Sequence, residues 1–216
     1  MEIILSEIEA RVLGCLIEKE LSTPDYYALS LNALVNACNQ KNNREPVTAF
    51  DESSVEQALE SLRAKHLVET TAAARVKKYG ETLVAARNLL PGEAAVLGEL
   101  LLRGPQTAGE LKGRAERMHK FEGLEQTEEA LQVLAEAGLA KKLERQPGRK
   151  EPRWAHLLSG EPGAAAEAPP AVVAPPAENE RLAKLEVEFS SLKMEFERLQ
   201  QMIEDIKNDL KAREGT

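Results

Sequence analysis

The stretch "RQPGRKEPRW" at residues 145–154 gathers four cationic side chains around a Pro-Gly turn signal. Lysine and arginine on such a loop can bind a phosphate backbone, because each neutralised phosphate releases a counterion. The same loop can equally be a solvated turn or face a protein partner, and both interpretations stay open at this stage. The candidate nucleic-acid-binding cations of this stretch are Arg145, Arg149, Lys150 and Arg153.

Smaller groups of polar and cationic residues would have to lie near this loop to complete a nucleic-acid surface. Asparagine side chains can hydrogen-bond base edges, although clustered asparagines more often form turns. The further candidates are Lys41, Asn42, Asn43, Arg44, Arg75, Lys77, Lys78, Arg114, Arg117 and Lys120.

No catalytic motif is present in the sequence, which lacks a phosphate-binding glycine loop, an HExxH pair and a GxSxG turn. The histidines are scattered along the chain. Cys15 and Cys38 lack CxxC spacing and fall at apolar helical positions, which favours buried structural thiols over a disulfide, a zinc site or a nucleophile. The sequence therefore predicts no enzyme, no catalytic residue, no metal and no cofactor.

The charge distribution gives one argument for nucleic-acid binding and one against it. The net charge is −8, and residues 161–216 supply most of it with 12 acidic and 7 basic residues, whereas residues 91–160 are neutral with 11 of each. An acidic chain disfavours phosphate binding, but a neutral segment with clustered cations weakens that argument. No apolar run is long enough for a membrane span, and the N-terminus lacks a basic signal region, so we expect a cytoplasmic protein.

An internal repeat organises the chain up to residue 160. The segment "EARVLGCL" at 9–16 recurs as "EAAVLGEL" at 93–100, an offset of 84 residues. A second match between segments 58–67 and 130–139 has an offset of 72 residues. Because the order is kept and the offset shrinks by 12, we expect two similar units, with extra residues in the first.

Hydrophobic spacing predicts three helices and a β-hairpin in each unit. In the first, a capping box of Ser6 and Glu9 begins one helix, the segment 31–38 forms a second, and Ser53 with Glu56 caps a third. The hairpin is expected at residues 67–73 and 79–86. In the second unit we expect helices near 92–103, from Thr107, and near 125–137, and a hairpin carrying the basic stretch. Trp154, at a strand position, is predicted to belong to the core rather than to a stacking platform.

Three helices followed by a hairpin are typical of the winged helix-turn-helix fold, in which the third helix often enters the major groove and the hairpin, or wing, contacts the backbone. The fold class is therefore mainly α with small β-hairpins (α+β). The third helices are acidic, however, and phosphates would repel them. The acidic residues at these positions are Asp51, Glu52, Glu56 and Glu60 in the first unit and Glu125, Glu128 and Glu129 in the second.

The segments "TPDYYALSLNALVNACNQKNNREPV" at 23–47 and "RQPGRKEPRWAHLLSG" at 145–160 resemble the YceH-like family of bacterial proteins. The resemblance covers roughly residues 4–160. It implies two tandem winged-helix domains. It implies no activity, because none is assigned to the family, and it therefore transfers no catalytic residue.

Beyond residue 160 the composition changes. Residues 161–180 form an Ala/Pro-rich linker that cannot bury a core, and residues 181–212 carry a heptad pattern over four heptads. The charges beside this seam favour a parallel homodimer, while trimers and intramolecular packing stay open. The predicted oligomerisation residues are Leu182, Leu185, Phe189, Leu192, Phe196, Leu199, Ile203, Ile206 and Leu210.

The predicted organisation is thus a winged-helix domain at 1–90, a second at 91–160, a linker at 161–180 and a coiled-coil helix at 181–212. Two functions fit it, and analogy of fold favours the first over the second. The first is a transcription-regulator-like protein that binds duplex DNA through backbone contacts and dimerises through its terminal helix. The second is an adaptor that binds a protein partner through its winged-helix surfaces without binding DNA. A continuous basic face across both wings would favour DNA, and basic patches separated by acidic helices would favour the adaptor.

Overall fold

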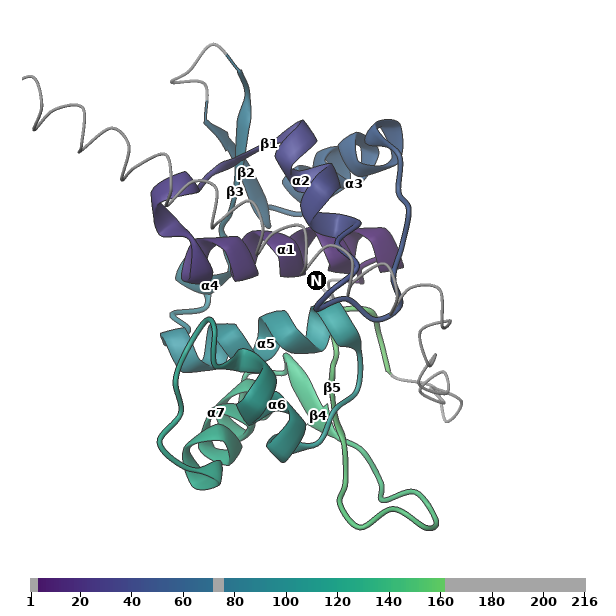
Figure 1. Cartoon of the computed structure of the whole chain (residues 1–216), viewed down its shortest axis with the longest axis vertical. Helices are drawn as coiled ribbons and strands as arrows, with labels where there is room; N and C mark the ends of the chain where they lie inside the picture. Colours follow the sequence, from purple (N-terminus) through teal and green to yellow (C-terminus); the bar gives the residue numbers. More distant parts are fainter. Residues whose placement is uncertain (1–3, 72–75, 162–216) are drawn as a thin grey trace, which may run out of the picture. The chain divides into compact units, whose positions relative to one another are not determined.

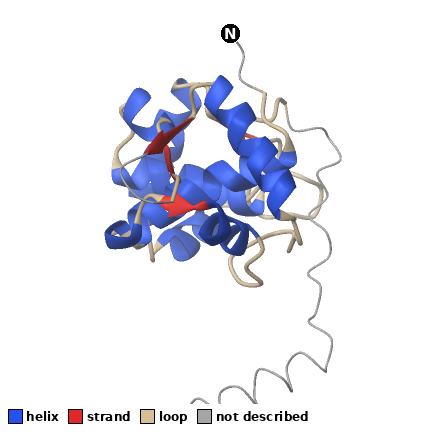
Figure 2. Cartoon of the chain, turned by 90° about the horizontal axis from the view of Figure 1, so that it is seen from above, coloured by secondary structure: helices blue, strands red, loops and turns tan. Residues whose placement is uncertain are grey.

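A computed structural model describes residues 4–71 and 76–161. The chain divides into two compact units, residues 1–166 and 167–216, and the described residues all belong to the first. This unit is mainly helical, with two small antiparallel sheets. Figure 2 shows the strands in red among the helices in blue. The predicted linker and coiled-coil helix lie outside the described residues.

Both halves of this unit contain three helices followed by a two-stranded hairpin, and the first half also contains η1, β1 and α4. The first half (residues 4–90) contains α1 (Glu7–Ser22), η1 (Pro24–Tyr26), β1 (Leu29–Ser30), α2 (Leu31–Cys38), α3 (Glu52–Ala64), β2 (Val68–Thr71), β3 (Lys78–Glu81) and α4 (Leu83–Ala86). The second half (residues 91–160) contains α5 (Pro91–Arg103), α6 (Ala108–Ala115), α7 (Leu124–Glu136), β4 (Ala140–Lys142) and β5 (Trp154–His156). The helices predicted from hydrophobic spacing are therefore confirmed.

Side-chain caps determine where the helices begin. The capping boxes of Ser6 with Glu9 and of Thr107 with Glu110 are both formed. The predicted cap of α3 is wrong, because Asp51 rather than Ser53 accepts the hydrogen bond, from the backbone N–H of Ser54 at 2.7 Å. A carboxylate at this position can satisfy an otherwise unpaired amide as well as a hydroxyl does.

The first sheet has the strand order β1-β3-β2, with Leu29 paired to Tyr79 and Val68 to Glu81. The predicted strand at residues 79–86 is too long, because β3 ends at Glu81 and α4 follows it. The Glu81 side chain accepts a hydrogen bond from the Val84 N–H at 3.0 Å, and this bond stabilises the first turn of α4. The strand β1 was not predicted from the sequence.

The second sheet pairs β4 with β5, with Lys142 opposite Trp154. Gln106 forms an additional antiparallel bridge with Trp154, just before α6 begins. This bridge occupies the position that β1 has in the first half, between the first and second helices. The equivalence extends the internal repeat from the helices to the sheets.

The helices α1 and α5 pack along each other and join the two halves (Figure 1). A Cβ on Gly14 would lie 2.9 Å from the Leu101 Cβ, and a Cβ on Gly98 would lie 3.3 Å from the Ile17 Cγ2. The reversed order of these contacts shows that the helices are antiparallel. Gly14 and Gly98 are equivalent in the repeat, so both copies use a glycine to let the two backbones approach.

One hydrophobic cluster extends from Leu5 to Leu158 through both halves. Trp154 is 6% exposed, which confirms its predicted place in the core. Cys15 and Cys38 are fully buried free thiols. Among the described residues, no helix is long and apolar enough to cross a membrane.

Candidate interaction surfaces

The loop between β4 and β5 presents three of its four predicted cations to solvent. Arg145, Arg149 and Lys150 are exposed around a turn in which the Arg149 N–H donates to the Gln146 carbonyl. Arg153 is different, because its guanidinium donates to the Pro105 carbonyl and to the Glu110 carboxylate. It therefore ties the hairpin to the start of α6.

The loop after α2 contributes fewer exposed side chains than its sequence suggests. Lys41 and Asn42 are exposed, but Asn43 has a φ of 62° and its side chain accepts a hydrogen bond from Arg103 at 2.6 Å. Asn43 is therefore a turn residue whose side chain is already engaged. Arg44 is only 4% exposed and points into the protein.

Arg44 belongs to a buried ionic network between the two halves. Its guanidinium binds the Glu18 carboxylate, which also pairs with Arg117 from the second half. Arg117 pairs in turn with Glu99 at 2.9 Å, and Arg103 lies 3.1 Å from the same carboxylate. Burial alone would raise the pKa of Glu18, but the hydrogen bond and charge of Arg44, with the charge of Arg117, lower it instead. These arginines hold the halves together.

The other predicted cations are distributed over separate elements. Arg114 donates to the Gln106 side chain at 2.6 Å, while Lys120 is exposed in the loop before α7. Lys77 is exposed and Lys78 is half-buried at the start of β3. Arg75 lies outside the described residues.

The third helices, α3 and α7, expose acidic faces. Their inward positions are apolar, as in Val55 and Leu59 of α3, and their outward positions carry the glutamates identified in the sequence. On α7 two apolar side chains join the acidic face, with Leu124 40% exposed and Val133 41% exposed. The exposed glutamates are Glu52, Glu56 and Glu60 on α3 and Glu125, Glu128, Glu129 and Glu136 on α7.

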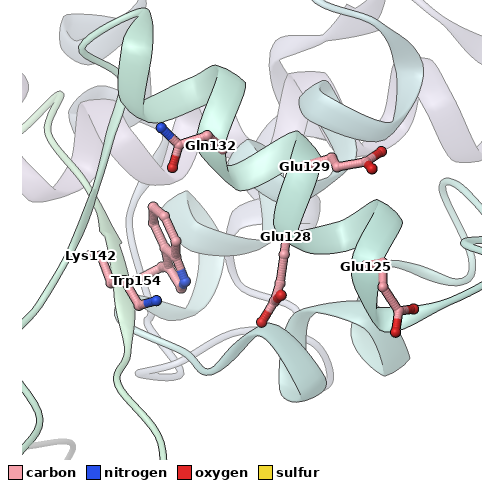
Figure 3. Close-up of a pocket in the computed structure, with 6 residues that line it drawn as sticks. All are labelled: Glu125, Glu128, Glu129, Gln132, Lys142 and Trp154. Atoms are coloured by element: carbon pink, nitrogen blue, oxygen red, sulfur yellow. The ribbon is translucent and has the colours of Figure 1, made fainter.

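The acidic face of α7 borders a surface groove of about 380 Å³ beside the second hairpin (Figure 3). Its lining residues are Glu125, Glu128, Glu129, Gln132, Lys142 and Trp154. The Lys142 ammonium lies 5.6 Å from the centre of the Trp154 ring, a cation–π contact that the pairing of β4 with β5 imposes. Sequence analysis placed Trp154 in the core but gave no sign that its edge would line a groove.

A carboxyl pair at the end of α1 also escaped sequence analysis. Glu81 is 8% exposed, and its side chain hydrogen-bonds to that of Glu20. Burial, followed by the hydrogen bond and charge of Glu20, raises the pKa of Glu81 to about 7. The backbone N–H of Glu81 donates to the Tyr27 hydroxyl at 2.6 Å. Because Glu20 and Glu81 are far apart in the sequence, only the packing of α1 on β3 brings them together.

The two hairpins leave the unit in opposite directions. In Figure 1, β2 and β3 lie toward the top, whereas the loop joining β4 to β5 extends toward the bottom. The exposed cations of the two hairpins, Lys77 on one and Arg145, Arg149 and Lys150 on the other, therefore form separate patches. Within residues 4–71 and 76–161, no cluster of His, Cys, Asp or Glu is arranged to hold a metal ion.

Comparison with known proteins places this chain in a family. The family model described as "Protein of unknown function, DUF480" matches residues 5–149. The chain belongs to the DUF480 family. It is 51% identical to a UPF0502 protein of Geobacter sulfurreducens, covering 96% of this chain and 99% of that protein. It is 53% identical to a UPF0502 protein of Solibacter usitatus, covering 93% and 98%.

Membership of the DUF480 family, whose curated proteins carry the UPF0502 name, confirms the YceH-like resemblance. The matched region ends in the loop of the second hairpin, so it covers the first half and most of the second but stops short of Trp154. The family description assigns no activity. Function in this DUF480 member must therefore be argued from its surfaces.

Proposed function

We propose that this DUF480 protein is a protein-interaction adaptor built from two winged-helix units. The order of three helices and a hairpin supports the winged-helix assignment in both halves. The short strand β1 and the Gln106 bridge support it further, because both pair with the hairpin from the same place, between the first and second helices. In this fold the third helix is the usual recognition element.

The observation that carries the adaptor proposal is the acidic character of both exposed third helices. A helix that enters the major groove lies between two phosphate backbones, and its glutamates would be repelled there. A protein partner has no such constraint and can offer complementary basic side chains. The exposed Leu124 and Val133 on α7 add the apolar contact that protein interfaces use.

The ion pairs and the positions of the predicted cations support the same proposal. Arg44, Arg117 and Arg153 bind carboxylates of this chain, so their charges are already compensated. Exposed Lys77 and the exposed cations Arg145, Arg149 and Lys150 belong to hairpins that leave the unit in opposite directions (Figure 1). A single straight duplex would therefore contact one basic patch at a time.

Site-specific photocrosslinking in living cells tests this function. A benzoylphenylalanine residue is placed at Gln57 on α3 or Gln132 on α7, both exposed, and a control is placed at exposed Arg87 after α4. We expect discrete crosslinks to another protein from the two third-helix positions and none from the control. Equal crosslinking at all three positions, or none at either third helix, would remove the adaptor proposal.

A second candidate is weak binding of duplex DNA through the phosphate backbone. Exposed Arg145, Arg149 and Lys150 favour it, because no hydrogen bond or ion pair engages their side chains within the described residues. Such contacts supply affinity without reading sequence. In this candidate the heptad residues 182–210 dimerise the protein, and the dimer brings two basic loops together. We also propose a cytoplasmic location.

A further inference from the structure

The groove beside α7 is built from two walls of different character. One wall is the helix itself, from which Glu125 and Glu128, three residues apart, point to the same side (Figure 3). The opposite wall is the second hairpin, with Lys142 and Trp154 on paired strands. A charged helix thus faces an aromatic side chain across a hollow of about 380 Å³.

The glutamates of this groove have no partner among the described residues. Within the described residues, no ion pair or hydrogen bond engages the carboxylates of Glu125, Glu128 or Glu129, and all three residues are exposed. Other surface glutamates of the unit are engaged, as Glu110 is by Arg153. The groove therefore retains uncompensated negative charge that an incoming cation could neutralise.

The aromatic wall already holds a cation. The Lys142 ammonium lies 5.6 Å from the centre of the Trp154 ring, within the range in which the negative face of an indole attracts positive charge. Arginine binds such a face better than lysine, because its planar guanidinium stacks on the ring and is more weakly hydrated. An arginine from outside could thus take the place of Lys142 while its neighbours in the partner reach the glutamates.

We propose that this groove binds an arginine-rich segment of a partner protein. Glu125 and Glu128 pair with its guanidinium groups, and one guanidinium replaces the Lys142 ammonium over the Trp154 ring, which is otherwise only 6% exposed. This inference rests on the proposed adaptor function and names the chemistry of its partner. Charge excludes two other occupants. Duplex DNA is repelled by the glutamates, and the C-terminal residues 161–216 of this chain are themselves acidic, with 12 acidic and 7 basic residues.

A peptide titration tests this proposal, because Trp154 is the only tryptophan in the chain and reports directly from the groove. The probe is an eight-residue peptide of alternating arginine and glycine, and the matched control peptide alternates glutamate and glycine. The full-length protein is titrated while Trp154 emission and heat release are recorded. We expect saturable binding of the arginine peptide alone, with a change in Trp154 emission.

Two pairs of variants locate the binding. E125Q/E128Q should weaken the arginine peptide about three- to tenfold, since two exposed ion pairs are lost. E56Q/E60Q removes the same charge from exposed positions of α3 and should change the affinity less than twofold. K142A should tighten binding, because it frees the face of the Trp154 indole. K141A is its control, since it removes the same charge from the neighbouring exposed position. K141A should have the smaller effect, because successive residues of a strand point to opposite faces of the sheet.

Three results would overturn the groove assignment. Equal affinity of the wild type and E125Q/E128Q would place the peptide elsewhere, and a loss confined to E56Q/E60Q would assign binding to α3 while leaving the adaptor function in place. No peptide binding, together with a lower sedimentation mass of E125Q/E128Q, would identify the occupant as the basic loop of a second copy. None of these three results removes the adaptor function, which the photocrosslinking experiment tests separately.

Discussion

Single buried ionisable residues hold the described unit together more than its surface charges do. Glu18 is fully buried between Arg44 of the first half and Arg117 of the second. Removing one partner of a buried pair leaves an uncompensated charge in a low-dielectric environment, which is more costly than replacing the whole pair. The sequence offered no means to separate these structural arginines from surface cations, because both kinds occur in the same polar loops.

We therefore predict that E18Q lowers the free energy of unfolding by about 3 kcal/mol, since Arg44 would lose its carboxylate. Urea denaturation monitored by circular dichroism measures this change. E60Q, at an exposed position of α3, is the matched control and should change stability by less than about 0.5 kcal/mol. Equal stability of both variants would show that the network contributes nothing.

Glu81 predicts a pH dependence of stability. Its pKa is raised to about 7 in the folded protein from an ordinary value of 4.5, so the folded state binds more protons between these pH values. The contribution of Glu81 is therefore complete below pH 4.5 and is lost as the pH rises through 7, a change of about 3 kcal/mol. E81Q should remove this loss, because glutamine keeps an acceptor for the Val84 N–H without a charge.

The contribution of Glu81 is measured as the difference in the free energy of unfolding between E81Q and the wild type. This difference is needed because titration of His156 changes stability over a similar pH range with the opposite sign. Burial lowers the pKa of His156 to about 4, so its contribution is complete above pH 6.5 and is lost as the pH falls through 4. Urea denaturation at pH 5 and pH 8 isolates Glu81. We expect E81Q to gain stability relative to the wild type at pH 8, and an identical difference at both pH values would contradict the carboxyl pair.

At the scale of elements, α1 and α5 form the central contact of the unit. Gly14 and Gly98 allow their antiparallel approach, and the two glycines are equivalent positions of the repeat. A methyl group at Gly14 would lie 2.9 Å from the Leu101 Cβ, an atom that moves only with the backbone, whereas at Gly98 the nearest atom is a side-chain methyl at 3.3 Å. The two sites therefore differ in how well they can adjust.

We predict that G14A destabilises the protein by about 1–2 kcal/mol, because overpacking outweighs the helix propensity gained by alanine. G98A should be close to neutral, since Ile17 can shift by a few tenths of an ångström. Thermal unfolding of both variants tests this ranking. Greater destabilisation by G98A would contradict the geometry of the contact between α1 and α5.

The helices were predictable from the sequence because their apolar spacing and capping residues are local signals, as in Ser6 with Glu9. The short strand β1 was not, since its two residues become a strand only by pairing with β3, almost fifty positions later. The end of β3 was missed for a similar reason, because the Glu81 side chain starts α4 within an apolar run. The groove at Trp154 depends on tertiary packing alone.

At the scale of the whole molecule, the described unit is complete without the C-terminal residues. Its hydrophobic cluster begins at Leu5 and ends at Leu158, and a backbone hydrogen bond joins these two residues at 2.6 Å. Truncation after Gly160 should therefore leave a soluble protein that melts cooperatively, with a melting temperature within about 3 °C of the full chain. Calorimetry measures this, and loss of a cooperative transition would show that the tail completes the core.

The central claim is that the third helices bind protein rather than read DNA, and a DNA titration tests it most directly. Fluorescence anisotropy is recorded with several duplexes of different sequence at a series of salt concentrations. We predict no preference among the duplexes. The second candidate adds weak binding that is alike for all sequences, with a slope of log K against log salt of roughly −2 to −4 per hairpin.

R149E/K150E should flatten this slope by about 2, and Q57A/Q132A on the third helices should change nothing. Gln57 and Gln132 are the matched test positions because glutamine is the side chain that would read adenine from an exposed recognition helix. Tight binding to one duplex, about a thousandfold above the others and abolished by Q57A/Q132A, would contradict the account and identify the protein as a sequence-specific DNA reader.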